Sequence, residues 1–194
     1  MLKVVVLISG GGSNLKALLE AAADPAYPAR IAAVGSDTEA SGLDHARAAG
    51  VPSFVVRPRD YGSREEWGAA FAAAIREYDP GLVVSAGLMR ILPAAFVREF
   101  SPHLINTHPA LLPLHPGAHA VRDALAAGAT ETGVSVHIID EGVDTGPVLR
   151  QARVAIRPGE TEDELHERIK QIERPLLVET VREIAVGRLT LPTS

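Results

Sequence analysis

The chain of 194 residues contains no cysteine. Disulfide bonds, zinc–thiolate sites and thiol nucleophiles are therefore excluded. The absence agrees with a reducing compartment, so we expect the protein to be cytoplasmic. A signal-peptide pattern is missing too, because the apolar run from Val4 to Ile8 is too short for a signal core and no cleavage-like site follows it. That run indicates a first β-strand.

Long apolar segments and blocks of like charge are also missing. No segment approaches the roughly 20 apolar residues that a membrane helix needs. The formal net charge is −5, and no five consecutive residues carry the same charge. We therefore expect neither a nucleic acid nor a membrane as a partner. An anionic small molecule would have to be held by local cations and by backbone N–H groups.

What the chain does contain is typical of a globular α/β protein. Hydrophobic residues make up 46% and charged residues 22% of the sequence, which is ordinary for a soluble domain with a sizeable core. The length favours one domain over residues 1–194. We find no internal repeat, low-complexity segment or linker.

Short apolar runs alternate with segments of helical spacing through the first half of the chain. Strands are expected at 4–8, 31–34, 54–56, 82–84 and 103–106, and helices at 15–22, 42–49, 63–78 and 93–100. Ser13 and Asn14 are N-cap candidates for the first helix, and the spacing of Ser63 and Glu66 fits a capping box. This alternation predicts a Rossmann-like, mostly parallel twisted sheet flanked by helices.

The second half of the chain is less regular. A helix is expected over 117–127, and strands over 134–139 and 147–156. Thr161 and Glu164 form a second capping-box pattern, which opens a long C-terminal helix with a bend near Pro175.

An amide and an imidazole follow the fifth expected strand. Asn106 and His108 are two residues apart, and Pro109 ends regular structure after them. Alternate side chains of an extended chain point the same way, so both project from one face at the carboxyl end of a strand, where open α/β sheets bind ligands. Such a pair can hold an oxyanion and transfer a proton, although a lone histidine at this position is commonly structural.

A glycine-rich turn joins the first strand to the first helix. The segment Ser9–Asn14 reads SGGGSN, and backbone N–H groups at such a helix start can bind a phosphate. The dinucleotide pattern fails because Leu15 occupies its last glycine position. Asp37, at the end of the second strand, keeps a dinucleotide as an open alternative. A flexible turn is the alternative without function.

Two further loops carry polar groups. Asp144 lies between Gly142 and Gly146 after the 134–139 strand, and its carboxylate could pair with an imidazole and favour the charged form of that ring. His115 and His119 could contribute to a metal site with other histidines. Pro116 and Gly117 argue against a helix through that segment, so we expect no metal.

A fifth feature is an apolar loop that follows the fourth strand. Residues 87–93 read GLMRILP, with Arg90 as the one cation. This loop could line a pocket for a flat ring, or it could pack around the start of the next helix.

Taken together, these segments resemble the glycinamide ribonucleotide formyltransferase family. The matching segments are 8–14, 87–92, 106–113 and 140–147, and the resemblance extends from Val4 to about Gly187. The resemblance implies transfer of the formyl group of 10-formyltetrahydrofolate, as cosubstrate, to the amine of glycinamide ribonucleotide in purine biosynthesis. We expect a monomer or homodimer. The N-terminal half is expected to bind the ribonucleotide phosphate and the C-terminal half the folate.

The resemblance also implies roles for individual residues. The catalytic group is Asn106, His108 and Asp144. The ribonucleotide is expected to contact Gly12, Ser13, Asn14, Lys170 and Glu173. The folate is expected to contact Arg64, Met89, Arg90, Ile91, Leu92 and Asp140. The pair Ser36–Asp37 departs from the commoner pattern after the second strand, so no role is assigned there.

Two enzymes and one binding module compete with this interpretation. A formyltetrahydrofolate deformylase would pass the formyl group to water with the same three catalytic residues, and a methionyl-tRNA formyltransferase is a second relative. Both are expected to carry an additional domain, so the length of this chain disfavours them. A nucleotide-binding module without catalysis would make the three polar residues a coincidence.

Overall fold

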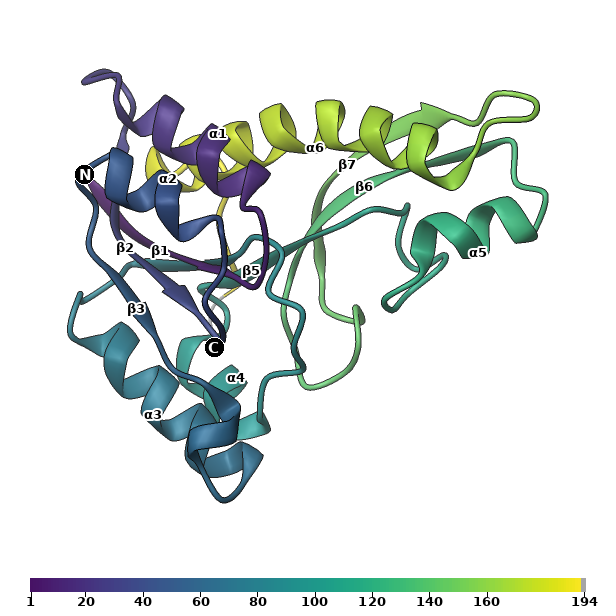
Figure 1. Ribbon diagram of the computed structural model, residues 1–194. Helices are drawn as coiled ribbons and strands as arrows, with labels where there is room; N and C mark the ends of the chain where they lie inside the picture. Colours follow the sequence, from purple (N-terminus) through teal and green to yellow (C-terminus); the bar gives the residue numbers. More distant parts are fainter. Residues whose placement is uncertain (193–194) are drawn as a thin grey trace.

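A seven-stranded sheet forms the centre of the protein (Figure 1). The structure is a computed structural model, and it describes residues 1–192. The strand order is β3-β2-β1-β4-β5-β6-β7. Strands β1 to β5 are parallel, whereas β6 is antiparallel to β5 and β7 is antiparallel to β6. The strands span Leu2–Ile8, Ala29–Ser36, Ser53–Val55, Leu82–Ser85, Leu104–His108, Glu131–Ile138 and Val148–Ala155. The expected mostly parallel sheet is confirmed.

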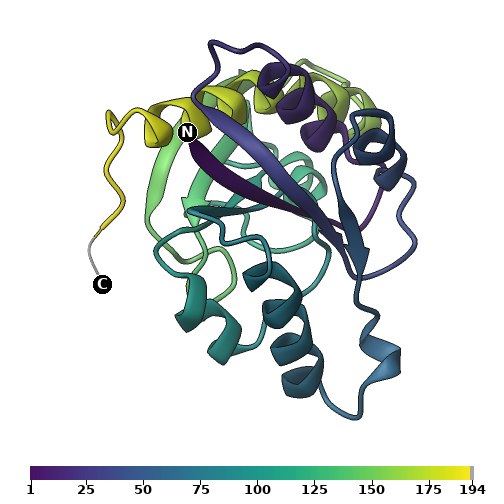
Figure 2. The same cartoon turned by 90° about the vertical axis from the view of Figure 1, so that its left-hand side faces the viewer.

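Helices cover both faces of this sheet. In Figures 1 and 2, α1, α2 and α6 lie over one face, and α3 and α4 lie over the other. The helices α1 to α6 span Ser13–Ala22, Leu43–Ala48, Arg64–Arg76, Ala94–Phe100, Ala120–Ala126 and Glu162–Ala185, and a 3-10 turn η1 spans Pro58–Asp60. The long C-terminal helix is therefore confirmed. No helix within residues 1–192 is both long and apolar enough to cross a membrane.

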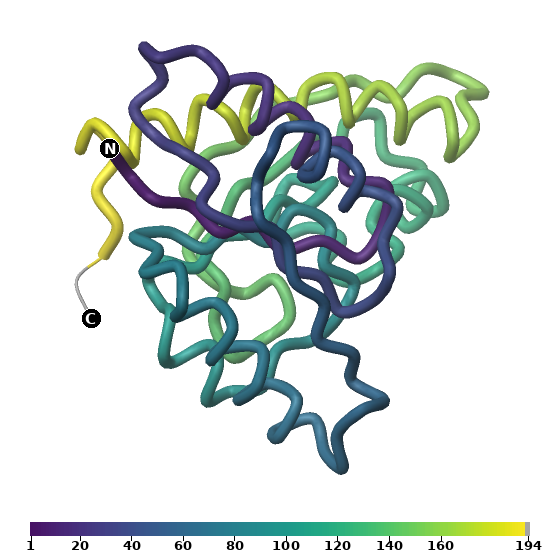
Figure 3. The backbone as a smooth tube through the Cα atoms, turned by 60° about the vertical axis from the view of Figure 1, so that its left-hand side comes forward, coloured from purple at the N-terminus to yellow at the C-terminus, as the bar shows by residue number. Residues whose placement is uncertain are grey.

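The two-sided burial of β1 explains its continuous apolar sequence. Val4 to Ile8 are all fully buried, as expected for a central parallel strand. Val4, Val6 and Ile8 pack toward α1 and α6, while Val5 and Leu7 join the cluster around Trp67 of α3. Figure 3 shows the last turns of α6 beside the start of β1, where Leu191 joins the first cluster.

Three helix starts differ in detail from the expectations. Gly12, with φ +68°, is the N-cap of α1, and neither expected side-chain cap forms. Ser63 accepts from the Glu66 N–H, but the Glu66 carboxylate accepts from the Gly62 N–H, so only half of that capping box is present. Helix α5 begins at Ala120 rather than Gly117, because Gly117 has a left-handed φ of 90° that ends regular helix. The capping box at the start of α6 is complete.

The strand order reverses direction between β1 and β4. Chain connections leave these neighbours toward opposite sides of the sheet, so a crevice opens at their carboxyl ends. The glycine-rich turn follows β1, the 87–92 loop follows β4, and Asn106 and His108 end β5. The fold therefore brings the candidate segments to one edge of the sheet.

Candidate active site

Four polar side chains at the junction of β5 and β6 form the candidate catalytic cluster: Asn106, His108, His137 and Asp144. The antiparallel register sets Asn106 opposite His137, and the Asn106 Nδ2 atom lies 3.2 Å from the His137 Nε2 atom. His137 Nδ1 lies 2.9 Å from the Ile138 carbonyl oxygen. That carbonyl can only accept, so Nδ1 carries a proton. Nε2 faces both the Asn106 amide and the Asp144 carboxylate, and it donates to that carboxylate when it is protonated.

Asp144 bridges the two histidines. Its Oδ2 atom lies 3.4 Å from His108 Nδ1, and its Oδ1 atom lies 3.5 Å from His137 Nε2. Asp144 has φ 54°, an uncommon conformation for a residue other than glycine. The three residues assigned to catalysis thus meet in one cluster, with Asn106 joined to Asp144 through His137.

His108 has an oxygen atom facing each of its ring nitrogens. Nε2 lies 2.8 Å from the His115 carbonyl oxygen, on the side of the ring opposite to Asp144. The protonated ring donates to both oxygens at once, whereas the neutral ring satisfies only one of them. This buried ring can therefore present an N–H to an oxygen atom at either nitrogen.

The Asp144 carboxylate is held in its charged form. Hydrogen bonding with His137 is the largest factor that lowers the pKa of Asp144, and burial opposes it. The Gly117 N–H, at 2.7 Å from Oδ2, and the nearby charge of His108 lower this pKa further. Asp144 therefore remains an anion over a wider pH range than a free carboxyl group, and it can orient a protonated His108.

A buried hydrogen-bond group fixes the loop that carries the His115 carbonyl. The Ser135 hydroxyl donates to the Ala110 carbonyl at 2.7 Å and accepts from the Leu112 N–H at 3.0 Å. Gln151 Nε2 donates to both Ser135 Oγ and the Leu112 carbonyl. Strands β6 and β7 thus hold the start of the 109–119 segment against the end of β5.

The glycine-rich turn lies at the adjacent strand end. A Cβ atom at Gly12 would come 3.1 Å from the Gly42 Cα atom, and the left-handed φ adds strain for any other residue. Ser13 and Asn14 form the first turn of α1, so their N–H groups point out of the helix start. Asn14 is buried and contacts Thr107 at 3.5 Å, and its Oδ1 atom has no partner within residues 1–192. An unsatisfied buried oxygen here suits a site completed by a ligand.

Lys170 and Glu173 lie on α6, which packs along α1. Lys170 Nζ pairs with Glu167 at 2.8 Å, and Glu173 is buried. The described residues contain no hydrogen bond that connects either side chain to the glycine-rich turn. The structure therefore places both on the helix beside α1 without joining them to the turn.

The residues expected to contact the folate are less closely grouped. Met89 and Ile91 are 70% and 60% exposed, whereas Leu92 belongs to the core around Phe96. Arg64 begins α3 and is exposed, with Glu65 as its ion-pair partner. The 87–92 loop therefore presents two apolar side chains to solvent, as a surface for a flat ring requires.

Asp140 organises the loop that carries Asp144. Its Oδ1 atom accepts from the Gly142 N–H at 3.0 Å and from the Thr145 hydroxyl at 2.7 Å. A Cβ atom at Gly146 would fall 1.8 Å from the Ile138 carbonyl oxygen, so only glycine fits there. Asp140 thus shapes the 140–147 loop from within.

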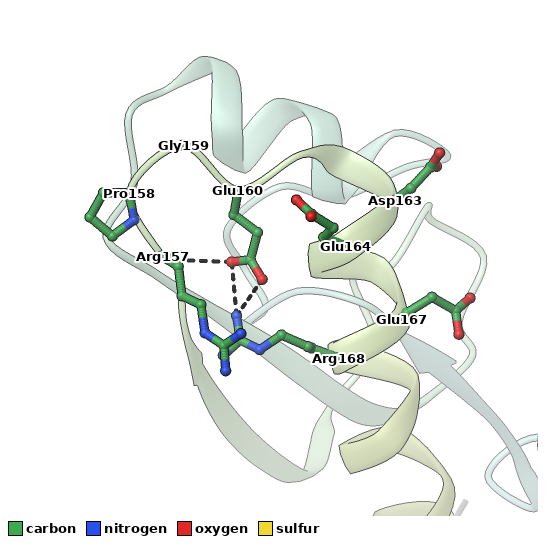
Figure 4. A pocket seen from close by; sticks show the side chains of 8 residues that line it. All are labelled: Arg157, Pro158, Gly159, Glu160, Asp163, Glu164, Glu167 and Arg168. Carbon is green, nitrogen blue, oxygen red and sulfur yellow. Dashed lines mark hydrogen bonds and ion pairs between the residues drawn. The ribbon is translucent and has the colours of Figure 1, made fainter.

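A surface hollow at the start of α6 is separate from this cluster (Figure 4). It is lined by Arg157, Pro158, Gly159, Glu160, Asp163, Glu164, Glu167 and Arg168. The Glu160 carboxylate pairs with Arg168 at 2.6 Å and accepts from the Arg157 N–H. Glu164 completes the capping box of α6. These acids satisfy the β7–α6 turn and the helix start, so the hollow has a structural explanation.

The histidines do not assemble into a metal site. Within residues 1–192, no group of three or more histidine, aspartate or glutamate side chains has the arrangement of a metal site. His115 meets His108 through its backbone carbonyl, and His119 is the exposed N-cap residue of α5.

His137 is the member of the cluster that we did not expect from the sequence. His137 and Ser135 are two residues apart on β6, so they lie on one face of the strand. Only the β5–β6 register shows that this face also carries Asn106 and His108. The support from Gln151 was equally hidden, because β7 pairs with β6 far from Leu112 in sequence.

The chain is similar to known transferases over nearly its whole length. The family model described as formyl transferase matches residues 2–181. The chain is 50% identical to a phosphoribosylglycinamide formyltransferase of Mycobacterium tuberculosis, over 97% of this chain and 87% of that protein. It is 39% identical to the protein of the same name from Escherichia coli K12, over 98% of this chain and 90% of that protein.

Solved structures show the same fold. The glycinamide ribonucleotide transformylase 1 of Symbiobacterium toebii superposes with a TM-score of 0.95 at 39% identity, over 99% of this chain and 91% of that chain. The fold is thus that of a group-transfer enzyme of the Rossmann-like class. The chain belongs to the formyl transferase family.

Proposed function

We propose that this enzyme transfers the formyl group of 10-formyltetrahydrofolate to the amine of glycinamide ribonucleotide. The observation that carries the proposal is His108, which is held between the Asp144 carboxylate and a carbonyl oxygen at the end of β5. The relatives bearing the transferase name match nearly the whole chain. The products are formylglycinamide ribonucleotide and tetrahydrofolate.

The His115 carbonyl indicates where the reacting oxygen binds. It lies 2.8 Å from His108 Nε2, the distance at which a protonated imidazole stabilises an oxyanion. We place the formyl oxygen in the position of this carbonyl, with the Asn106 amide as the second donor. Each well-placed donor contributes roughly 2.7–4 kcal/mol to stabilising the tetrahedral intermediate. The 109–119 segment must then shift so that the substrate oxygen replaces its own.

Proton transfer follows from the same arrangement. The amine attacks the formyl carbon and becomes a protonated nitrogen in the tetrahedral intermediate. That proton must reach the departing folate nitrogen, with His108 or an ordered water as the carrier. Asp144 stays anionic, orients His108 through Nδ1 and stabilises its charge. No covalent bond to the enzyme is required.

The substrates are assigned to neighbouring strand ends. The N–H groups at Gly12, Ser13 and Asn14 are proposed to hold the ribonucleotide phosphate. Glu173 is proposed to bind the ribose hydroxyls, with Lys170 as an assisting cation. Residues from both halves of the chain thus contribute to the ribonucleotide site.

The folate is assigned to the other side of the cluster. Met89, Ile91 and the backbone near Leu92 are proposed to contact the pterin, which the 140–147 loop covers. The 87–92 loop has two exposed apolar side chains and follows β4, the neighbour of β5, which supports this placement. Arg64, at the start of α3, is assigned to a more distant part of the cofactor.

A coupled assay tests the reaction. Purified protein is mixed with 10-formyltetrahydrofolate and either glycinamide ribonucleotide or buffer alone, and tetrahydrofolate release is followed. We expect release only with the ribonucleotide. Equal release in buffer would identify a deformylase, and tight binding of both ligands without release would identify a non-catalytic module.

A further inference from the structure

Ser9, Asp37 and Arg90 form a hydrogen-bonded triad at the carboxyl ends of β1, β2 and β4. Asp37 follows β2 and its side chain is only 3% exposed. Its Oδ1 atom accepts from the Ser9 hydroxyl at 2.7 Å, and its Oδ2 atom accepts from Arg90 Nε at 2.7 Å. Ser9 Oγ in turn accepts from the Met89 N–H at 2.8 Å. None of these contacts is used by the catalytic cluster.

The triad occupies both Asp37 oxygens, so neither is free to bind a ribose. A dinucleotide site of this fold uses an acidic residue after the second strand as a free acceptor for ribose hydroxyls. Here both carboxylate oxygens already accept from protein donors, and the side chain is withdrawn from solvent. The dinucleotide alternative that Asp37 had kept open is therefore disfavoured by its surroundings.

Arg90 is fixed from two sides. Its Nε atom is bound by Asp37, and its guanidinium carbon lies 5.8 Å from the ring centre of the buried Trp67. Trp67 is itself held by a 2.8 Å hydrogen bond from Nε1 to the Val56 carbonyl. Within residues 1–192, the Nη atoms of Arg90 have no hydrogen-bond partner, and its side chain is 42% exposed. The guanidinium group of Arg90 is thus oriented, and its Nη atoms stay available to donate to a ligand.

The backbone of the same loop is fixed from the Ser9 side. The Ser9 N–H donates to the Gly87 carbonyl at 3.0 Å, and the Ser9 hydroxyl receives the Met89 N–H. These two bonds hold residues 87–89 against the end of β1. Leu88 and Leu92 anchor the loop in the core, whereas Met89 and Ile91 are exposed. The two bonds and the Arg90 pair therefore help to order its solvent-facing part.

We infer that Asp37 and Ser9 are positioning residues for the formyl donor, acting through Arg90 and the Met89 amide. The inference rests on the proposed function, because it assigns the 87–92 loop to the folate. Asp37 holds Arg90 in place before the folate binds, so the folate does not have to order this side chain. Pre-ordering a binding loop raises affinity for its ligand without changing the chemical step.

The test uses variants that each change one residue of the triad. Asp37→Asn keeps the size of the side chain and an acceptor for Ser9, but it sets an amide against Arg90 Nε. We expect KM for 10-formyltetrahydrofolate to rise about tenfold, with kcat and KM for the ribonucleotide within about twofold. Ser9→Ala is expected to raise the same KM by a smaller factor.

A double-variant cycle separates positioning from general structural support. Arg90→Gln is expected to raise the folate KM about as much as Asp37→Asn, and the double variant no more than either one. Independent effects would instead multiply to about a hundredfold. Asp79→Asn is the matched control, because it removes the same charge from the exposed Lys3–Asp79 pair at 2.8 Å and is expected to change neither KM.

Each outcome bears on the inference. A fall in melting temperature with both KM values unchanged would make Asp37 a purely structural partner and overturn it. Multiplicative effects with Arg90→Gln would overturn it as well. If the unmodified protein transfers no formyl group to the ribonucleotide, the proposed function fails instead, and direct titration with 10-formyltetrahydrofolate still shows whether Asp37→Asn weakens donor binding.

Discussion

The catalytic cluster and the glycine-rich turn are neighbours at one edge of the sheet, yet their polar groups are satisfied in different ways. In the cluster, Asp144 has partners on both oxygens and His108 has an oxygen at each nitrogen. In the turn, no side chain caps the start of α1, and the Asn14 Oδ1 atom has no hydrogen-bond partner within residues 1–192. The protein itself orders the groups that move charge, and it leaves open the groups that wait for a ligand.

This difference has a physical reason. A transition state exists too briefly to organise its surroundings, so the groups that stabilise it must be oriented beforehand. A phosphate is a stable ligand that can complete unsatisfied N–H groups when it binds. Variants in the cluster should therefore change kcat, and variants in the turn should change KM for the ribonucleotide.

The largest effect is expected for His108→Ala. The variant removes both the oxyanion donor and the proton carrier, so kcat should fall about 10³–10⁴-fold. The circular dichroism spectrum should match that of the unmodified protein, because the shortened side chain leaves β5 paired on both sides. Turnover close to that of the unmodified protein would contradict the assigned role.

Asp144→Asn should lower kcat about 10²–10³-fold, because the imidazolium loses its negative partner while the side-chain size is kept. Steady-state kinetics with both substrates measure this. Asp140→Asn is a useful comparison, since Asp140 shapes the same loop but lies outside the cluster. A larger loss for Asp140→Asn than for Asp144→Asn would argue against a catalytic role of Asp144.

Gly12→Val tests the other side of the comparison. A β-branched residue resists φ +68° and would crowd Gly42, so the turn must distort. We expect KM for the ribonucleotide to rise about 10–100-fold and KM for the folate to change little. A larger effect on the folate would move the phosphate site elsewhere. Gly50→Val, at a left-handed glycine after α2, is a control for backbone strain alone.

His137→Gln should have a smaller effect, about tenfold on kcat. The glutamine amide can still contact Asn106, but it cannot carry the positive charge that helps to hold Asp144. Unchanged kcat would show that Asp144 and Asn106 are held well enough by their other contacts.

The smallest effect concerns stability against pH. The pKa of Asp144 is lowered in the folded state, so its ionised form stabilises the fold at pH values above the pKa of a free carboxyl group. This contribution is lost as the pH falls through the folded-state pKa. The difference in unfolding free energy between the unmodified protein and Asp144→Asn should therefore decrease toward acidic pH in denaturant titrations. A difference that grows on acidification would contradict the direction of the shift.

The sequence by itself determined the architecture and the residue types of the site. Apolar runs and helical spacing specify most of the strands and helices, because burial on two faces demands continuous apolar residues as in Val4–Ile8. The common face of Asn106 and His108 followed from the period of two along a strand. The glycine-rich turn was visible because Gly12 must adopt a conformation that other residues avoid.

Only the tertiary structure decided which of these residues meet. The β5–β6 register brought His137 to Asn106. The loop after β6 brought Asp144, itself in a left-handed conformation, between two histidines. Asp37 looked like a free carboxylate until the fold set Ser9 and Arg90 against it. Apart from Asp144 with His137, these contacts join residues 28 to 53 positions apart. Local sequence patterns cannot specify them, because pairing register and loop packing depend on the whole sheet.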